Sequence, residues 1–508
     1  MRFTFLSLSR RFSFAMGFVW VLAAGAAETA AGRVAIDFGA NVRTWDGFGL
    51  NYVEGGHTAD PERDYQDYGG FSRLGEATRQ EVMDLLFGPV DGRKADDGLR
   101  VGLHKIFLDP HHQAAVAAPF VGASASTAMS RYFLFEAAKR LKARGRSIEV
   151  VTTYYGVPAW ATSTGKFHWR DMNPDRAKAL ADYMTNWIAY LRGELAARGF
   201  AETVRVRAAS LTNEGEARER WNEDGSPQPK RDYNLHWPSK TIAAFLPVLA
   251  ESLRAGGQQQ IALMPCETAG WDGLAEAQGD RIAATLMGDS VALKHIGLLG
   301  GHSFGRSGAP GAEAIAQFRR AKGDALRAWT TSHDWQKGDV AFAEHTRAQI
   351  YDIGVTGIIT WAATKRLSEW QRYTLRPPNP QCAVLINEDG TTRVQSGYSF
   401  YKQFTRAGQP GMAVAEVRAE AGTDLRVAAF ARNGTSHADA FVVINLGEMA
   451  HAVEVTVTGT AATRFRAHRT SGDASAEAFK DVGIVECSAD GRLRYTSPPK
   501  AVTTFFGL

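Results

Sequence analysis

The chain has 508 residues, of which 44% are hydrophobic and 22% are charged, and its formal net charge is +4. This length exceeds what one hydrophobic core usually supports, so we expect two domains, one large and one small. The composition is that of an ordinary globular protein and excludes a disordered or membrane-embedded chain, while the small net charge, without a run of five like charges, gives no electrostatic support for a nucleic-acid partner.

The first thirty residues have the layout of a secretory signal. Arginines precede an apolar run at 12–24, and small residues suited to cleavage follow at Ala26 and Ala27. The run is too short, and too quickly followed by polar chain, to be a spanning helix. We therefore predict a signal peptide at 1–27 and an exported mature protein, periplasmic or extracellular, without a membrane span.

Cysteine is sparse in this chain. The three cysteines are Cys266, Cys382 and Cys487. An odd and widely spaced set of three excludes a disulfide scaffold and a zinc cluster, and it allows at most one bridge. No ligand cluster with metal spacing is present in the sequence, so we expect neither a metal nor an organic cofactor.

From residue 45 to residue 376, apolar strands alternate with amphipathic helices. The clearest helix starts at Asn173, which can cap it, and Pro174, which fits a first turn; apolar residues then repeat at three- and four-residue spacing until Gly199. We predict strands at 45–52, 100–109, 148–154, 204–212, 260–264, 292–302, 325–332 and 356–361, and further helices at 76–87, 127–142, 239–254, 273–287, 312–322 and 341–353. Eight such βα units predict a closed (β/α)₈ barrel over 45–376.

Beyond this segment the pattern changes to short alternating strands. Turn signals for hairpins occur at 387–390, 433–434 and 490–491. Residues 385–508 are therefore predicted to form an all-β sandwich. The isolated strand at 34–38 needs a sheet to complete, so we assign 28–44 to the same domain.

Polar and aromatic side chains follow the predicted barrel strands. The active site of such a barrel lies at the carboxyl ends of its strands. There, carboxylates supply proton transfer and nucleophilic attack at an acetal, an amide can hold a sugar hydroxyl, and tryptophan offers an apolar floor to a sugar ring. The candidate catalytic or substrate-binding residues at these ends are Trp160, Asn213, Glu214, Glu267, His302 and Trp361.

Each of these residues also has an ordinary structural explanation. Asn213 and Glu214 would be a solvated loop pair, and the two tryptophans would pack at the barrel rim. Glu267 would form a salt bridge across the barrel mouth. His302 would be a hydrogen-bonded core histidine, because a single histidine at a strand end does not identify a role.

Several segments together resemble glycoside hydrolase family 30 and its relatives in clan A, including the galactosylceramidase and glucosylceramidase types. The matching segments are WDGFGLNY at 45–52, PAWATSTG at 158–165, NE at 213–214, PCE at 265–267, GVTGIITW at 354–361 and YKQFTRAGQPGMAVAEV at 401–417. In this order and spacing, the segments span nearly the whole mature chain. The resemblance implies a glycoside hydrolase in which Glu214 is the general acid/base and Asn213 contacts the 2-hydroxyl of the sugar.

The sequence departs from this family at strand seven. A retaining enzyme of the clan needs a second glutamate at the end of that strand, where the prediction 325–332 places Ser332. A strand at 340–345 would put Glu344 there instead, but it would leave only about nine residues for the last helix, so we favour a helix at 341–353 that contains Glu344. Alternatively, Asp334 activates water in an inverting mechanism, or the protein binds glycans without cleaving them.

The sequence thus predicts an exported glycoside hydrolase whose partner is a carbohydrate, a β-linked glycan or glycoconjugate. Glu214 protonates the departing oxygen, and the second carboxylate is open between Asp334 or Glu267, at the wider separation of an inverting pair, and Glu344, at the narrower one. Ser332 joins the other strand-end residues as a substrate contact. The alternatives are a non-catalytic carbohydrate-binding protein on a degenerate hydrolase scaffold and a transglycosylase, which would use the same residues.

Overall fold

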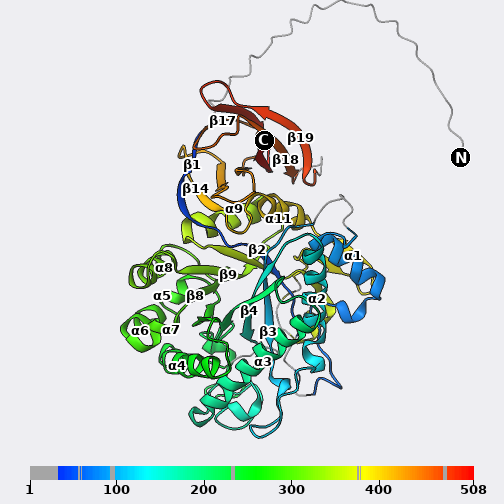
Figure 1. Cartoon of the computed structure of the whole chain (residues 1–508), viewed down its shortest axis with the longest axis vertical. Coiled ribbons are helices and arrows are strands. Elements are labelled where there is room, and N and C mark those ends of the chain that lie inside the picture. Colours follow the sequence, from blue (N-terminus) through cyan, green and yellow to red (C-terminus); the bar gives the residue numbers. More distant parts are fainter. Residues whose placement is uncertain are drawn as a thin grey trace, which may run out of the picture.

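The computed structural model describes residues 32–54, 58, 60–91, 98–229, 235–373, 377, 379–472 and 477–508. The predicted signal peptide at 1–27 lies outside these described residues. A parallel barrel wrapped by helices lies below a second, mainly antiparallel sheet in Figure 1. The predicted fold class, a (β/α)₈ barrel with an appended β-sheet domain, is confirmed.

Parallel strands form the barrel in the order β6-β5-β4-β3-β2-β10-β9-β8-β7. Their bounds are β2 (Gly47–Asn51), β3 (Leu103–Leu108), β4 (Ile148–Tyr154), β5 (Val204–Ser210), β6 (Ala262–Met264), β7 (Glu267–Thr268), β8 (Leu298–His302), β9 (Arg327–Asp334) and β10 (Gly357–Trp361). β6 and β7 are two halves of the fifth strand position, interrupted at Pro265, because proline has no N–H to donate to a neighbouring strand. The nine strands therefore occupy the eight positions of the barrel.

Helices surround these strands on the outside of the barrel (Figure 1). They are α1 (Glu76–Phe87), α2 (Ala128–Ala143), α3 (Ala177–Ala197), α4 (Ser239–Ala255), α5 (Asp272–Ala275), α6 (Ile282–Gly288), α7 (Ser290–His295), α8 (Ala309–Lys322), α9 (Val340–Ala348) and α10 (Leu367–Tyr373). Shorter 3₁₀ turns lie at Phe71–Arg73, Pro110–His112, Ala125–Thr127, Ala159–Ala161, Pro174–Arg176 and Arg218–Arg220, and a π-helical turn, Gln349–Ile353, extends α9. As predicted, the Asn173 side chain caps the turn that leads into α3, accepting from the N–H of Asp175.

Two predictions around strand six are wrong. The single helix expected at 273–287 is two helices, α5 and α6, because the chain between them turns tightly at Gln278 and Gly279, both with positive φ. The strand expected at 292–302 begins only at Leu298. The Asp289 carboxylate accepts from the N–H groups of Val291 and Ala292 and so starts α7 within the expected strand.

The second sheet has the order β19-β18-β21-β16-β15-β14-β1-β17-β20. Its strands are β1 (Gly32–Thr44), β14 (Ala413–Ala419), β15 (Leu425–Ala431), β16 (Ala440–Asn445), β17 (His451–Thr458), β18 (Arg464–Ser471), β19 (Lys480–Glu486), β20 (Arg492–Ser497) and β21 (Ala501–Gly507). The sheet curls so that its two edge strands, β19 and β20, contact each other. β1, more than 350 residues away in sequence, lies inside the sheet between β14 and β17.

The C-terminal segment also contains a helix, α11 (Ser396–Ala407), which the all-β prediction for 385–508 omitted. α11 contacts β2 of the barrel and β16, β18 and β21 of the second sheet. The Tyr401 hydroxyl donates to the carbonyl of Gly49 at 2.8 Å and accepts from its N–H at 3.2 Å. The helix therefore joins the two parts through one continuous hydrophobic core.

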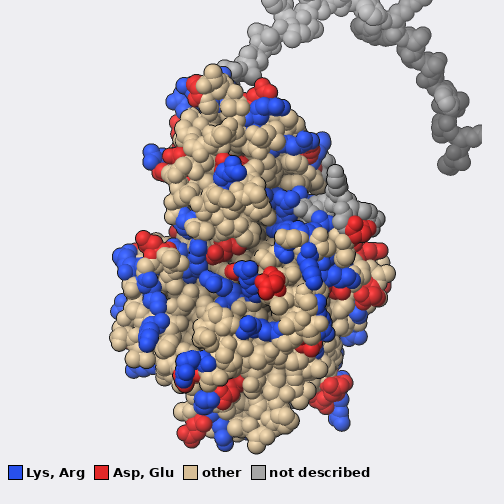
Figure 2. All heavy atoms as spheres, viewed as in Figure 1, with Lys and Arg blue, Asp and Glu red and all other residues tan. Residues whose placement is uncertain are grey.

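A small three-stranded sheet lies outside the two large sheets. β11 (Thr364–Arg366), β12 (Val384–Ile386) and β13 (Thr392–Val394) pair beside the barrel. In the described part of the chain, none of the helices is both long and apolar enough to cross a membrane. On the face seen in Figure 2, lysine and arginine are interspersed with aspartate and glutamate.

The position of β1 predicts how a fragment of the second sheet behaves. Residues 385–508 expressed alone should aggregate or remain partly unfolded, because β14 and β17 would each have an unpaired edge. Circular dichroism during urea titration checks this, with a synthetic 32–44 peptide added in trans as the control that should restore a cooperative transition. A soluble fragment that unfolds cooperatively without the peptide would contradict the prediction.

Candidate active site

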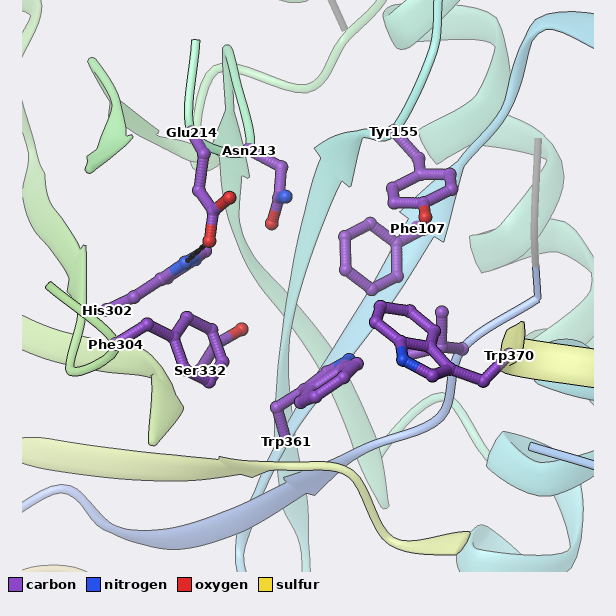
Figure 3. A pocket seen from close by; sticks show the side chains of 10 residues that line it. Phe107, Tyr155, Asn213, Glu214, His302, Phe304, Ser332, Trp361 and Trp370 are labelled. Carbon is purple, nitrogen blue, oxygen red and sulfur yellow. Dashed lines mark hydrogen bonds and ion pairs between the residues drawn. The ribbon is translucent and has the colours of Figure 1, made fainter. Parts of the chain in front are cut away.

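A narrow pocket with a cavity volume of about 30 Å³ opens at the carboxyl ends of the barrel strands. Its lining residues are Val53, Phe107, Tyr155, Asn213, Glu214, His302, Phe304, Ser332, Trp361 and Trp370. Figure 3 shows Glu214 and Asn213 on one side of the pocket and the rings of Phe107, Tyr155 and Trp370 on another. Five sequence-predicted residues therefore meet here, although they come from four different strand positions.

Glu214 is held from several directions. Its Oε1 lies 2.9 Å from His302 Nδ1, and its Oε2 accepts from the Arg220 guanidinium. Its backbone is left-handed, with φ of 55°, a conformation that is uncommon outside glycine and clusters at functional sites. The Glu214 N–H donates to the Glu267 carbonyl at 2.8 Å, which fixes the residue against the next strand position.

Gly215 allows the chain to turn immediately after this glutamate. A Cβ atom at position 215 would lie 2.1 Å from Thr212 Oγ1 and 2.8 Å from the ring of Trp237. The close approach therefore requires glycine. The sequence Asn-Glu-Gly after a buried strand thus has a steric reason as well as a chemical one.

Below the pocket, Lys105 on β3 lies at the centre of a buried polar cluster. Its Nζ donates to Glu267 Oε2 at 2.6 Å and to Asn213 Oδ1 at 2.9 Å, and it lies 3.5 Å from His302 Nε2. Lys105 and Glu267 are both fully buried. Glu267 also lies 3.6 Å from His302 Nε2, so the histidine bridges Glu267 and Glu214.

The charge on Glu267 is set by its neighbours. Burial acts to raise the pKa of this carboxyl, but the Lys105 ammonium and His302 outweigh burial and lower it well below its usual range. Glu267 is therefore an ionised partner of Lys105 and is not exposed to the pocket. The salt bridge anticipated from the sequence as the structural alternative for this residue is present.

His302 is able to support both protonation states of Glu214. With the proton on Nδ1, the ring donates to the Glu214 carboxylate, and Nε2 accepts from Lys105. With the proton on Nε2, the ring faces the Glu267 carboxylate, and Nδ1 accepts from a protonated Glu214. The cluster can thus hold the Glu214 carboxyl group in either protonation state.

Aromatic side chains form the rest of the pocket wall. Trp361 packs edge-on against Trp370 and Phe304, with ring centroids 5.1 and 5.6 Å apart. The buried Lys365 ammonium lies 3.9 Å from the centroid of the Trp361 ring, and burial lowers the pKa of Lys365 to about 8. These contacts hold Trp361 in a fixed orientation toward the pocket, as an apolar surface for a sugar ring requires.

Strand β9 brings Ser332 into the pocket through a β-bulge. β9 pairs Thr330 with Gly301 and Ser332 with His302, so Thr331 is an additional residue in the ladder. Without the bulge, alternation from the inward-facing Trp329 would bring His333 inward. Instead, Ser332 lines the pocket and His333 faces α9, where its Nε2 lies 3.0 Å from Thr346 Oγ1.

The other predicted site residues lie elsewhere. Glu344 is on α9, where it pairs with Arg347 and Arg426. Asp334 ends β9 and accepts from Gln336 rather than lining the pocket. Trp160 donates from its ring nitrogen to the Gln113 carbonyl and packs against the hydrophobic core instead of the pocket. A strand at 340–345 is excluded, because these residues belong to α9.

Sequence reasoning missed three charged residues at this site. Lys105 and Arg220 were not singled out, although a lysine inside the apolar strand LHKIFL is a signal for a buried charge partner. Glu216 was also missed. Its Oε1 accepts from the Ala269 N–H at 2.6 Å, and burial, reinforced by the charge of Glu214, raises its pKa to about 7.

No group of three or more His, Cys, Asp or Glu side chains is placed to hold a metal ion within the described ranges. Cys266, Cys382 and Cys487 are not joined by disulfide bonds.

Comparison with known proteins shows similarity in structure. No protein-family model matches the sequence, and no curated protein matches it. The catalytic domain of the family 30 xylanase C from Talaromyces cellulolyticus is 14% identical, with 94% of this chain and 100% of that chain covered and a TM-score of 0.67. A conserved exported protein from Bacteroides fragilis is 12% identical (93% and 99% covered, TM-score 0.66), and an endo-β-1,6-glucanase is 15% identical (94% and 94% covered, TM-score 0.63). The chain therefore has the glycoside hydrolase family 30-like fold over nearly its whole described length.

The buried ion pair generates a prediction about stability. Glu267→Gln should lower the free energy of unfolding by about 3–5 kcal/mol, because it leaves the Lys105 charge buried without a counter-ion. Glu251→Gln, which removes an exposed partner of Arg254, is the matched control and should change stability little. Denaturant unfolding with both variants measures the difference.

The same pair predicts a pH dependence. Because the pKa of Glu267 is lowered on folding, its contribution is fully present above the pKa of an unfolded glutamate, about 4.3, and is lost as the pH falls through the lower folded pKa. The stability difference between wild type and Glu267→Gln should therefore shrink in strong acid, as the pH falls below the pKa of an unfolded glutamate and through the lower pKa of folded Glu267. A difference that disappears near pH 7 would show that Glu267 is not ionised in the folded protein.

Proposed function

We propose that this protein is an exported glycoside hydrolase that cleaves a β-linked glycan or glycoconjugate and uses Glu214 as its general acid/base. The observation that carries the proposal is the position of Glu214. It follows the fourth strand of the barrel, beside Asn213, and lines a pocket whose other walls are mainly aromatic. Two solved structures with the same fold are named as a xylanase and as an endo-β-1,6-glucanase, which supports a glycan substrate.

Glu214 gives its proton to the glycosidic oxygen as the bond to the anomeric carbon breaks. His302 Nδ1 and the Arg220 guanidinium hold the carboxyl group during this transfer. Asn213, whose Oδ1 is taken by Lys105, directs its Nδ2 hydrogens to a sugar hydroxyl. Trp361 and Trp370 cover the apolar face of the sugar ring and so orient it. The residues that orient the sugar therefore differ from Glu214, which transfers the proton.

A second candidate function is glycan binding without cleavage. The specific observation in its favour is Ser332, a neutral side chain at the strand-seven position where the resemblance leads us to expect a carboxylate. A binding protein would keep the aromatic wall and Asn213 and would have no need of a second carboxylate. Turnover on a panel of glycosides separates the two functions, and products longer than the substrate would identify a transglycosylase.

Substitution of the proposed acid tests the mechanism. Glu214→Gln keeps the size and hydrogen bonding of the side chain but removes its titratable proton, so hydrolysis of substrates with poor leaving groups should fall by a factor of about 100 or more. Glu344→Gln removes a carboxylate from α9, outside the pocket, and should leave turnover unchanged. Wild-type turnover in Glu214→Gln would remove Glu214 from the mechanism.

Export is the second part of the proposal. It is supported by the signal-like succession at 1–27 and by the name of the exported Bacteroides fragilis protein that shares the fold. The protein recovered from producing cells should begin near residue 27 or 28 and should be found outside the cytoplasm. N-terminal sequencing of the fractionated protein measures this, and an intact residue 1 would contradict export by cleavage.

A further inference from the structure

The pocket offers one carboxylate to a bound sugar. Of the described residues that line it, only Glu214 carries a carboxyl group, while the strand-seven position holds Ser332. The two residues belong to the fourth and seventh strand positions and face the pocket from different sides (Figure 3). A retaining hydrolysis needs a nucleophile opposite the acid, usually a second carboxylate, but in some families the substrate supplies it.

Three other carboxylates, which come from strand positions around the site, are held away from the pocket. Glu267 is fully buried and ion-paired with Lys105, Glu216 binds the backbone of Ala269, and Asp334 binds Gln336. None of these three residues lines the pocket. Serine is also shorter than glutamate, so the exchange at position 332 leaves room beside the anomeric carbon for a group carried by the substrate.

We propose that this group is a 2-acetamido substituent: the substrate is a β-linked 2-acetamido-2-deoxy sugar, and its own amide oxygen is the nucleophile. The inference rests on the proposed hydrolase function and names the substrate class for the same site. An acetamido group is neutral and has one acceptor, one donor and a methyl group. The pocket that Glu214 lines has matching neutral groups in Asn213, Ser332 and the aromatic rings.

Each part of the acetamido group has a complement in the pocket. Because Lys105 takes Asn213 Oδ1 at 2.9 Å, the Nδ2 hydrogens of Asn213 are left to donate to the amide oxygen. Among the described residues, Ser332 Oγ accepts only a long hydrogen bond, 3.5 Å, from Asn51 Nδ2, so it can also accept from the amide N–H. Asn51 is fully buried, and its Oδ1 has no hydrogen-bond partner among the described residues. The wall beside Ser332 therefore has a second acceptor whose hydrogen-bonding capacity is unused.

The aromatic wall completes this complementarity. Trp361 and Phe304 lie next to Ser332 in the pocket lining, and their rings provide an apolar surface for the methyl group. A second carboxylate at this place would instead require a positively charged partner or would lose solvation. The neutral surroundings of Ser332 therefore suit an amide better than an ionised side chain.

The proposed reaction has two balanced steps. In the first, the amide oxygen forms a bond to the anomeric carbon, the bond to the glycosidic oxygen breaks, and Glu214 gives its proton to the departing alcohol; an oxazolinium ion remains. In the second, the Glu214 carboxylate takes a proton from water, whose oxygen bonds to the anomeric carbon as the bond to the amide oxygen breaks. The acetamido group is restored, Glu214 is protonated again, and the product keeps the β configuration.

A substrate panel tests the proposal directly. Wild-type protein is assayed with 4-nitrophenyl β-glycosides of N-acetylglucosamine and N-acetylgalactosamine and with those of glucose, galactose and xylose. Because well-placed intramolecular groups reach effective molarities of about 10⁵–10⁸ M, the acetamido sugars should have at least about 1000-fold higher kcat/KM. Trifluoroacetamido analogues should react far more slowly than the acetamido substrates, since fluorine withdraws electrons from the nucleophilic oxygen.

Two further measurements test the amide nucleophile and the role of Ser332. A thiazoline fused across C1 and C2 of N-acetylglucosamine, which mimics the oxazolinium ion, should inhibit the wild type competitively. Ser332→Glu should lose cleavage of acetamido sugars, because a carboxylate then occupies the place of the amide. Ser436→Glu, on an exposed loop of the second sheet, is the matched control and should keep wild-type activity; thermal unfolding of both variants shows that they are folded.

The possible failures are distinguishable. Hydrolysis of the glucoside, galactoside or xyloside at rates like those of the acetamido sugars would overturn the substrate class and leave the hydrolase function in place. Inversion of configuration, or no inhibition by the thiazoline, would overturn the proposed nucleophile. Absence of turnover on every glycoside would overturn the hydrolase function itself, and the inference with it.

Discussion

The site depends on one interaction, the buried ion pair between Lys105 and Glu267. Two opposite charges that are buried away from solvent destabilise the fold unless they pair with each other and their remaining donors and acceptors are hydrogen-bonded. Lys105 meets this requirement by binding Glu267 and Asn213 and approaching His302, and these partners come from different strand positions of the barrel. The orientation of Asn213 and the contact between His302 and Glu214 both follow from this arrangement, so a pair that is buried beneath the pocket fixes groups that face it.

The pocket combines this rigid polar base with a neutral strand-seven position. Glu214 is held by His302 and Arg220, whereas Ser332 has neither the charge nor the length of a glutamate. In the proposed reaction, the substrate supplies the nucleophile that Ser332 cannot supply. In a protein that only binds glycans, no nucleophile is needed.

The two sheets are bound to each other through β1 and α11. β1 precedes the barrel in sequence but lies inside the C-terminal sheet, and α11 places Tyr401 against Gly49 of the first barrel strand. Phe48 and Phe430 contact each other across the same boundary, with ring centroids 6.1 Å apart. The second sheet therefore packs against the barrel at its first strand.

Local sequence patterns determined most of the fold. The periodicity of apolar residues located the eight strand positions and α3, and the capping role of Asn173 was readable from its neighbours. The patterns failed where a single residue redirects the chain: Asp289 starts a helix in a segment that is apolar enough for a strand, and Gly279 divides a predicted helix. The helix α11 was missed because its sequence lies within a run of strands and turns.

The sequence alone also placed Asn213, Glu214, His302, Ser332 and Trp361 at strand ends, because residue type and position relative to a strand are local properties. Only the tertiary structure decided which of the candidates meet. Glu267 was joined to Lys105, 162 positions away, and Glu344 was directed to Arg426. The bulge at Thr331 decided that Ser332, not His333, faces the pocket. These contacts form only when the barrel closes and its strands come into register. Their interaction energies arise between groups that are distant in sequence, so no local sequence pattern can predict them.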